Sequence, residues 1–273
     1  MKRPLLSRIL PITLKQSAYW RLYHKRHLDF RPLFDEAPLA HCPEMKMYNL
    51  VPGDIISGNI AFNGFYELAL SNRIVELAKL GGTMIDVGAN MGYFSLLWTG
   101  VKKSNQVVTF EASPRNIALL SNNFAKNKVS PRALQISKAA GNTNGSITFD
   151  VGPDDQTGWG GVATEKTTSS FDFPVVRIDD ELPDIQVDVL KIDVEGADTW
   201  VLYGCEKLLR QRKIKNIFFE QNVDRMSRLG ISPGAAMRFL GEFGYECEPF
   251  GSVADEWFAY PKTGSGSQGK PIK

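Results

Sequence analysis

The sequence has few cysteines and histidines, and it lacks a long apolar run. Only three of its 273 residues are cysteine, they are far apart and no C-x-x-C pair occurs. This excludes a disulfide framework and a zinc cluster, and it favours a reducing, cytoplasmic compartment. The N-terminal apolar run spans only residues 9–14 and contains Pro11, so it is too short for a signal peptide or a transmembrane helix.

The sequence also lacks a broad excess of one charge. Its formal net charge is +2, but residues 1–30 hold seven lysines and arginines against one acid, Asp29, so the remainder is slightly acidic. Nucleic-acid binding needs a basic face or stripe. We therefore expect no nucleic-acid partner.

Composition divides the chain into three predicted segments. Residues 1–50 form a basic, aromatic extension, residues 51–261 a single catalytic domain, and residues 262–273 a disordered tail rich in glycine and serine. Tyr19, Trp20 and Tyr23 offer enough apolar area to bury the extension against the domain, near the entrance for an acceptor. Self-association through this extension is left open.

Short β-branched runs alternate with longer helical patterns, which indicates βαβ units and a parallel sheet. The predicted core strands are 83–87, 107–111, 133–138, 187–193 and 216–221. The predicted helices are 65–80, 91–100, 114–127, 197–212 and 233–243. Strand-like runs at 146–151 and 175–178 are predicted insertions. The runs 245–250 and 256–260 leave no room for a helix between them, so we expect an antiparallel hairpin at the sheet edge.

The first motif is the segment 84–94, MIDVGANMGYF, in which a strand enters a glycine turn and then a helix. Gly88 and Gly92 allow a tight turn and close backbone approach, and the helix N-terminus presents free N–H groups. The spacing differs from the dinucleotide pattern G-x-G-x-x-G, and Asp86 would repel a pyrophosphate. Asp86 can instead hold a cationic or hydroxyl-bearing ligand, directly or through water.

The second motif is a strand that ends in Glu111, about 20 residues beyond the glycine turn. An acid at this place is typical of ribose binding, so Glu111 is expected to accept both ribose hydroxyls. Ala112 and Ser113 then lead into a helix with Pro114 at a favourable first position. This segment is expected to line one face of an adenine.

The third motif is the buried strand and turn 189–196, VLKIDVEG. It delivers two carboxylates, Asp193 and Glu195, to the edge of the sheet where α/β proteins bind ligands. The structural alternative is that Asp193 caps the following helix and Glu195 accepts backbone hydrogen bonds.

In this order, D-V-G-A-N-x-G, F-E-A-x-P and L-K-I-D-V-E-G resemble the FkbM family of methyltransferases over about residues 65–250. The resemblance implies an α/β, Rossmann-like class I methyltransferase fold with a seven-stranded, mostly parallel sheet and an antiparallel C-terminal hairpin. It implies S-adenosylmethionine (SAM) as donor and O-methylation of a sugar or secondary metabolite. It carries donor binding onto Asp86, Gly88, Asn90, Gly92 and Glu111, and site chemistry onto Asp193 and Glu195. Glu67 also matches a family position.

Methyl transfer to a hydroxyl is helped by a general base. The three histidines all precede the predicted core, so the candidates are the strand-end carboxylates Asp193, Glu195 and Glu220. Asp193, which is also a candidate donor ligand, and Glu220 could alternatively present oxygen ligands to a magnesium ion. Beside them, Asn222 and Trp159 are candidate contacts to a small-molecule or glycan acceptor, Trp159 by stacking on a sugar face.

Three alternatives to the O-methyltransferase are kept. The first is a non-catalytic SAM-binding module, which a damaged motif would mark. The second is an N-methyltransferase acting on a small molecule. The third is a nicotinamide-dependent oxidoreductase, which the glycine spacing and the terminal hairpin disfavour.

Overall fold

The fold is built on a seven-stranded sheet, seen in a computed structural model that describes residues 2–251 and 255–262. Its strands are β3 (Thr83–Val87), β4 (Gln106–Phe110), β5 (Ala133–Ile136), β10 (Val189–Ile192), β11 (Ile217–Glu220), β12 (Tyr245–Pro249) and β13 (Glu256–Pro261). The order is β12-β13-β11-β10-β3-β4-β5, with β13 antiparallel to both neighbours and the other pairs parallel. The predicted mostly parallel sheet with a terminal antiparallel hairpin is confirmed.

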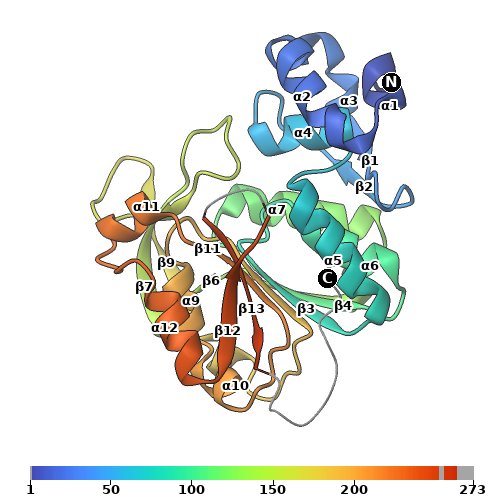
Figure 1. Cartoon of the computed structure of the whole chain (residues 1–273). Coiled ribbons are helices and arrows are strands. Elements are labelled where there is room, and N and C mark those ends of the chain that lie inside the picture. The colour runs from blue at the N-terminus through green and yellow to red at the C-terminus, as the bar shows by residue number, and fades with distance from the viewer. Residues whose placement is uncertain (1, 252–254, 263–273) are drawn as a thin grey trace.

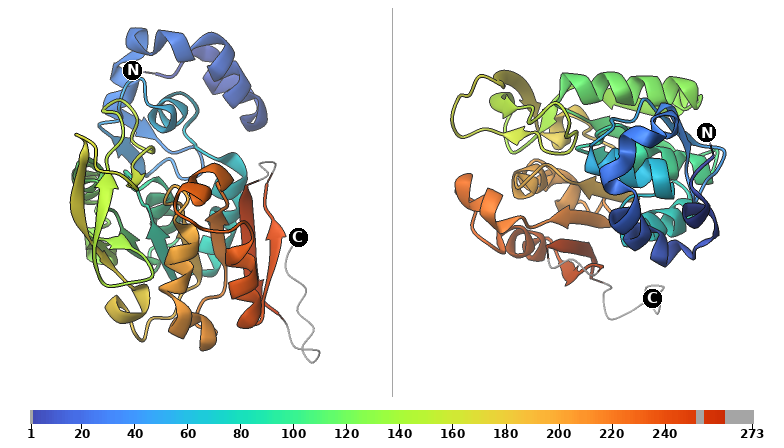
Figure 2. Two further views of the ribbon diagram at one scale, coloured as in Figure 1. Left: turned by 90° about the vertical axis from the view of Figure 1, so that its left-hand side faces the viewer. Right: turned by 90° about the horizontal axis from the view of Figure 1, so that it is seen from above.

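Helices cover both faces of this sheet (Figures 1 and 2). Side chains alternate along each strand, so Met84 packs into one apolar cluster and its neighbour Ile85 into the other. The first cluster includes helices α5 (Leu68–Leu80), α6 (Tyr93–Val101) and α7 (Pro114–Lys126). The second includes α9 (Asp198–Tyr203), α10 (Glu206–Arg210) and α12 (Ala235–Glu242). Because the sheet is buried on both faces, the sequences of its strands are nearly continuous apolar runs.

The chain reverses its direction across the sheet beside β3. It runs outward from β3 through β4 to β5, then returns to place β10 on the other side of β3. Strand order therefore switches between β3 and β10, and in open α/β sheets ligands bind beyond the carboxyl ends of the strands at this point.

Three helices differ from their predicted bounds, two because of a left-handed residue at the N-terminus and one because of a long-range contact. α5 begins at Leu68 rather than residue 65, because Glu67 has a left-handed φ of 42°. α6 begins only after Gly92, whose φ is 89°. The predicted helix 197–212 is wrong as one element: it is divided into α9 and α10 around Gly204, where an added Cβ would lie 2.1 Å from the carbonyl oxygen of Gly141.

The region between β5 and β10 forms a second, four-stranded sheet, followed by the short helix α8 (Ile178–Glu181). Its strands are β6 (Ala139–Ala140), β7 (Gly145–Asp150), β8 (Gly161–Val162) and β9 (Ser170–Val176), in the order β6-β9-β7-β8. The predicted run 146–151 overlaps β7, whereas 175–178 is only the end of β9 and the start of α8. The loop before β8, residues 151–160, reaches toward the N-terminal helices.

The N-terminal region is helical and shares a core with the first sheet face (Figure 1). It comprises α1 (Leu5–Ile9), α2 (Ile12–Leu22), a 3-10 turn (His24–Phe30), α3 (Pro32–Asp35), the hairpin β1 (Glu36–Pro38) and β2 (Lys46–Tyr48), and α4 (Ile55–Asn63). Tyr19 is buried against Phe62, with ring centroids 5.1 Å apart. Trp20 was expected to be buried and is instead 40% exposed, with its ring edge-on to that of Tyr19 at 5.4 Å between centroids.

The remaining described elements are the 3-10 turn Ser130–Arg132 and α11 (Val223–Arg228). The division at residue 50 stays a prediction. The predicted disordered tail 262–273 lies outside the described residues, apart from Lys262. No helix in the described part of the chain is both long and apolar enough to cross a membrane.

Candidate functional site

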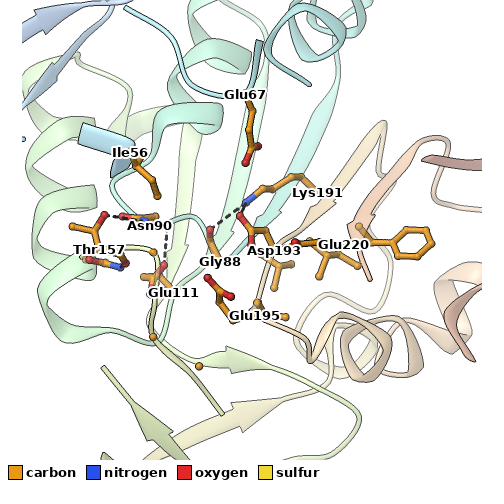
Figure 3. A pocket seen from close by; sticks show the side chains of 18 of the residues that line it. Ile56, Glu67, Gly88, Asn90, Glu111, Thr157, Lys191, Asp193, Glu195 and Glu220 are labelled. Atoms are coloured by element: carbon orange, nitrogen blue, oxygen red, sulfur yellow. Dashed lines mark hydrogen bonds and ion pairs between the residues drawn. The ribbon is translucent and has the colours of Figure 1, made fainter. Parts of the chain in front are cut away.

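A cavity of about 890 Å³ opens beyond the carboxyl ends of β3, β4, β10 and β11, at the switch in strand order. The loop 156–161 lines another side, and Thr13 and Gln16 of α2 reach it from the N-terminal region. Its volume lies within the range of small-molecule and cofactor sites. Figure 3 shows the polar side chains that converge there.

Gly88 and Gly92 are required by packing on either side of the glycine turn. Gly88 has a φ of 72°, and an added Cβ would lie 1.9 Å from the carbonyl oxygen of Asp193, so the turn presses against the end of β10. An added Cβ at Gly92 would meet Leu120 of α7 at 2.6 Å. Gly88 lines the cavity, whereas Gly92 lies behind it and shapes the turn.

Asp86 also lies behind the cavity wall. It is 1% exposed, accepts a hydrogen bond from Ser95 Oγ at 2.6 Å and pairs with Lys191 Nζ at 3.7 Å. Burial raises its pKa, while Lys191 and Ser95 act in the opposite direction. Asp86 therefore acts on the site through Lys191 and the turn, without lining the cavity itself.

Glu111, at the end of β4, joins two loops through its carboxylate. One oxygen accepts the N–H of Asn90 at 2.7 Å, and the other accepts those of Ala112 and Ser113 at 3.0 and 2.8 Å. Burial raises the pKa of Glu111, and these three N–H donors oppose that rise. A carboxylate has about four acceptor positions, so about one remains for a ligand. The expected acceptance of two ribose hydroxyls would require rearrangement or bifurcated bonds.

A hydrogen-bonded chain connects the glycine turn to the loop above it and to the N-terminal region (Figure 3). Asn90 Nδ2 donates to Thr157 Oγ1 at 3.3 Å, and Thr157 donates from Oγ1 and from its backbone N–H to the carboxylate of Asp54. Asp54 also accepts the N–H of Ser57 and so caps α4. Three segments more than 30 residues apart in sequence thus close one side of the cavity.

Lys191 supplies a buried ammonium to the cavity. Its Nζ donates to Gly88 O at 3.3 Å and to Asp193 Oδ2 at 3.2 Å, beside the ion pair to Asp86. Burial disfavours the ammonium, but Asp193, Asp86 and Glu67 outweigh that cost and raise the Lys191 pKa above its ordinary value. Lys191 therefore stays charged and fixes Asp193 against the glycine turn.

Four further carboxylates, those of Glu67, Glu195, Glu220 and Glu256, face the cavity with raised pKa values, for which burial is the largest cause. The pKa of Glu67 is raised to about 8, with Asp193 adding repulsion and Lys191 opposing it. The pKa of Glu195 is raised to about 7, although Arg225 Nε lies 3.1 Å from its carboxylate. The pKa of Glu220 is raised to about 8, and in the described part of the chain its carboxylate has no hydrogen bond or ion pair. These groups favour a positively charged ligand.

Two residues expected at the acceptor side occupy different positions. Trp159 lines the cavity and is 52% exposed. Asn222 does not line it, and its side chain accepts the N–H of Arg225 at 3.2 Å as the cap of α11. Next to the ends of β10 and β11, the buried carboxylate of Asp198 accepts the backbone N–H groups of Glu220 and Val194.

The cavity contains polar atoms that suit a ligand with several hydrogen-bonding groups. Asn90 Oδ1, Ser113 Oγ and Asn116 Oδ1 are buried and have no partner among the described residues. Buried polar atoms are seldom left unpaired without a ligand or ion to complete them. For a metal ion the arrangement fits less well, because the described residues hold no group of three or more histidine, cysteine or acidic side chains able to ligate one.

Residues 86–247 match the family model described as methyltransferase FkbM domain. The chain belongs to this family. Its fold is that of class I SAM-dependent methyltransferases. None of the curated proteins compared with the chain matches it significantly.

Solved structures of methyltransferases resemble this FkbM-family chain at low identity. One is the SAH-bound methyltransferase PaMTH1 of Podospora anserina, with 12% identity, 93% of this chain and 99% of that chain covered, and a TM-score of 0.48. Another is the O-methyltransferase TomG of Streptomyces achromogenes, solved with SAM, with 14% identity, coverage of 73% and 82%, and a TM-score of 0.41.

Sequence reasoning missed several residues of the site. Lys191 stands within the third motif, but lysine in a buried strand gave no sign that it would join Gly88 to Asp193. Asp54 and Thr157 are 103 residues apart, and only the fold brings them together. For Asp54 one signal was available, since an aspartate directly before an apolar helical run is typical of an N-cap.

Proposed function

We propose that the chain is a SAM-dependent O-methyltransferase that acts on a hydroxyl of a sugar or secondary metabolite. The observation that carries this proposal is the placement of Glu220, an unpaired carboxylate with a raised pKa, in the same cavity as Glu111 and the glycine turn. The family supplies the methyl-transfer chemistry. The cavity supplies a base suited to a hydroxyl acceptor.

The donor would lie along the ends of β3 and β4. The adenosyl part would be held by Gly88, Asn90, Glu111, Ala112 and Ser113, which together offer the buried polar atoms described above. Bound there, SAM supplies an electrophilic methyl group on a sulfonium cation. Asp193 borders that position, and a sulfonium bound there would lower the raised pKa of Glu67 and favour its carboxylate form, so the two acids suit a cation in the cavity. Asp86 and Gly92 would act from behind the turn.

The general base would be Glu220. Asp193 is engaged by Lys191 at 3.2 Å and Glu195 by Arg225 at 3.1 Å, so both carboxylates are already held by a cation. Glu220 has no such partner in the described residues, and its pKa of about 8 lies close to neutral pH. It would take the proton that the acceptor hydroxyl loses, while Asp193, Glu195 and Trp159 position the acceptor.

A direct test is a transfer assay with methyl-labelled SAM. The purified protein would be offered matched sets of small polyols, sugars and phenols, and the same scaffolds with an amine in place of the hydroxyl. The proposal expects label in methyl ethers, identified by NMR of the product. Label only in methylamines would favour the N-methyltransferase, and SAH binding without any transfer would favour the non-catalytic module.

The magnesium alternative has its own control in this assay. Transfer that is lost with EDTA and restored by magnesium would make Asp193 and Glu220 metal ligands. Transfer that is unaffected by EDTA agrees with Glu220 as the base. We further propose that the protein works in the cytoplasm on a small-molecule or glycan acceptor.

A further inference from the structure

A second cavity lies beside the first, in the N-terminal region that precedes the matched family domain. It measures about 470 Å³ and is lined by Tyr19, Trp20, His24, Lys25, His27, Gly53, Ile55 and Gln156. Ile55 and Gln156 line both cavities, so the two are neighbours. A molecule that reacts in the first cavity and extends past these two residues would enter the second.

Gln156, which lines both cavities, is held from two sides. Gln156 Nε2 donates to Gly53 O at 3.1 Å, and its backbone carbonyl accepts from Arg115 Nη2 at 3.0 Å. The loop is thus anchored to the N-terminal region and to α7. Residues that precede the matched domain, Gly53 and Ile55, therefore line these cavities next to Gln156.

The two cavities differ in charge. The first is lined by two lysines, Lys138 and Lys191, and by seven acidic residues: Asp54, Glu67, Glu111, Asp193, Glu195, Glu220 and Glu256. The second is lined by Lys25 and two histidines and has no acidic lining residue. Lys25 is exposed and makes no ion pair within the described part of the chain. An acceptor with an anionic end would be oriented with that end in the second cavity and its reacting group in the first.

Trp20 gives the second cavity an aromatic surface. It is 40% exposed, and its ring lies 4.7 Å from that of His24, centroid to centroid. A half-exposed indole with an adjacent imidazole and lysine is suited to a ring that carries an anionic substituent. We propose that Trp20, His24 and Lys25 form a distal subsite for a sugar bearing a carboxylate or phosphate, which selects and orients the acceptor. The subsite depends on the proposed function only because the sugar is taken to be the methyl acceptor.

The subsite can be tested in the full-length protein by NMR. The indole N–H signal of Trp20, assigned by its loss in Trp20→Phe, would be followed during titration with glucuronate, glucose 6-phosphate, glucose and inorganic phosphate. We expect both anionic sugars to shift the signal with an affinity about two- to fivefold tighter than that of glucose, the range that one exposed charge pair provides. Comparing the two anionic sugars shows whether carboxylate or phosphate is preferred.

Lys25→Met should remove the preference for the anionic sugars, whereas Lys103→Met, an exposed lysine on the turn before β4, should keep it. SAH affinity, measured by calorimetry, should be unchanged in both variants. Equal affinity for glucose and the anionic sugars, no shift of the Trp20 signal, or a preference that survives Lys25→Met would overturn the subsite. Failure of the wild type to bind SAH would instead contradict the proposed function and leave the sugar titration valid.

Discussion

The two halves of the main cavity are built in different ways. The half proposed to bind the donor consists of the ends of β3 and β4 with their following turns, so its residues lie within 30 positions of one another. The half proposed to bind the acceptor combines β10 and β11 with the 156–161 loop and helix α2, which are far apart in the chain. A short contiguous unit can be encoded as a motif, whereas a surface assembled from distant segments varies with each of them.

The largest expected effect falls on the acceptor half. Glu220→Gln should lower the turnover number at least about 100-fold, the usual minimum contribution of a general base, with SAH affinity within about threefold of wild type. Glu206→Gln, on the exposed side of α10, is the matched control. Steady-state kinetics with calorimetry measures both quantities. Full turnover in Glu220→Gln would remove Glu220 as the base.

The donor half should show the reverse pattern. Glu111→Gln disturbs a carboxylate that accepts three backbone N–H groups, so SAH affinity should fall about 30-fold, which corresponds to roughly 2 kcal/mol of charge-assisted hydrogen bonding. Calorimetry at saturating protein would measure it, again beside Glu206→Gln. The comparison of the two halves breaks down if this variant binds SAH as tightly as wild type does.

A pH profile sharpens the assignment of the base. Because burial raises the pKa of Glu220 to about 8, most of it is protonated at pH 7 and it becomes an effective base as the pH rises through 8. The turnover number should therefore increase about tenfold between pH 7 and pH 9. The rise should be absent in Glu220→Gln. A profile that is flat in the wild type, or a rise retained in the variant, points to another group.

The smallest expected effect concerns the junction between the halves. Thr157→Val removes the hydroxyl that links Asn90 to Asp54, and the loss of a net hydrogen bond of about 1 kcal/mol should weaken SAH binding about fivefold. Thr143→Val, in an exposed turn, serves as the control. Unchanged SAH affinity in Thr157→Val would mean that the loop above the cavity is independent of the donor site.

The same contrast explains which features could be predicted from the sequence. β3 was predicted with its observed bounds, because a β-branched run that ends in a glycine turn is a local signal. The antiparallel hairpin was predicted from the short gap between the runs 245–250 and 256–260, which leaves no room for a helix. In contrast, the split between α9 and α10 depends on the approach of Gly204 to Gly141, which no local pattern reveals.

The site residues could likewise be predicted where the signal is local, and not where it depends on contacts between distant segments. The sequence predicted Gly88, Glu111 and Asp193 at strand ends, and all three line the cavity. Asn222 was also predicted there, but it caps the helix α11 beside the cavity. The role of each side chain stays a proposal. Lys191 could not be inferred as the partner of both Gly88 and Asp193, because that geometry depends on the parallel pairing of β10 with β3.

A crystal structure of the complex with S-adenosylhomocysteine tests the central claim most directly. The account predicts the adenosyl group against the Gly88–Asn90 turn and Ser113, a ribose hydroxyl hydrogen-bonded to Glu111, and the sulfur facing the Asp193 and Glu220 side of the cavity. A ligand bound elsewhere, or one bound in this cavity with its ribose away from Glu111, would contradict it.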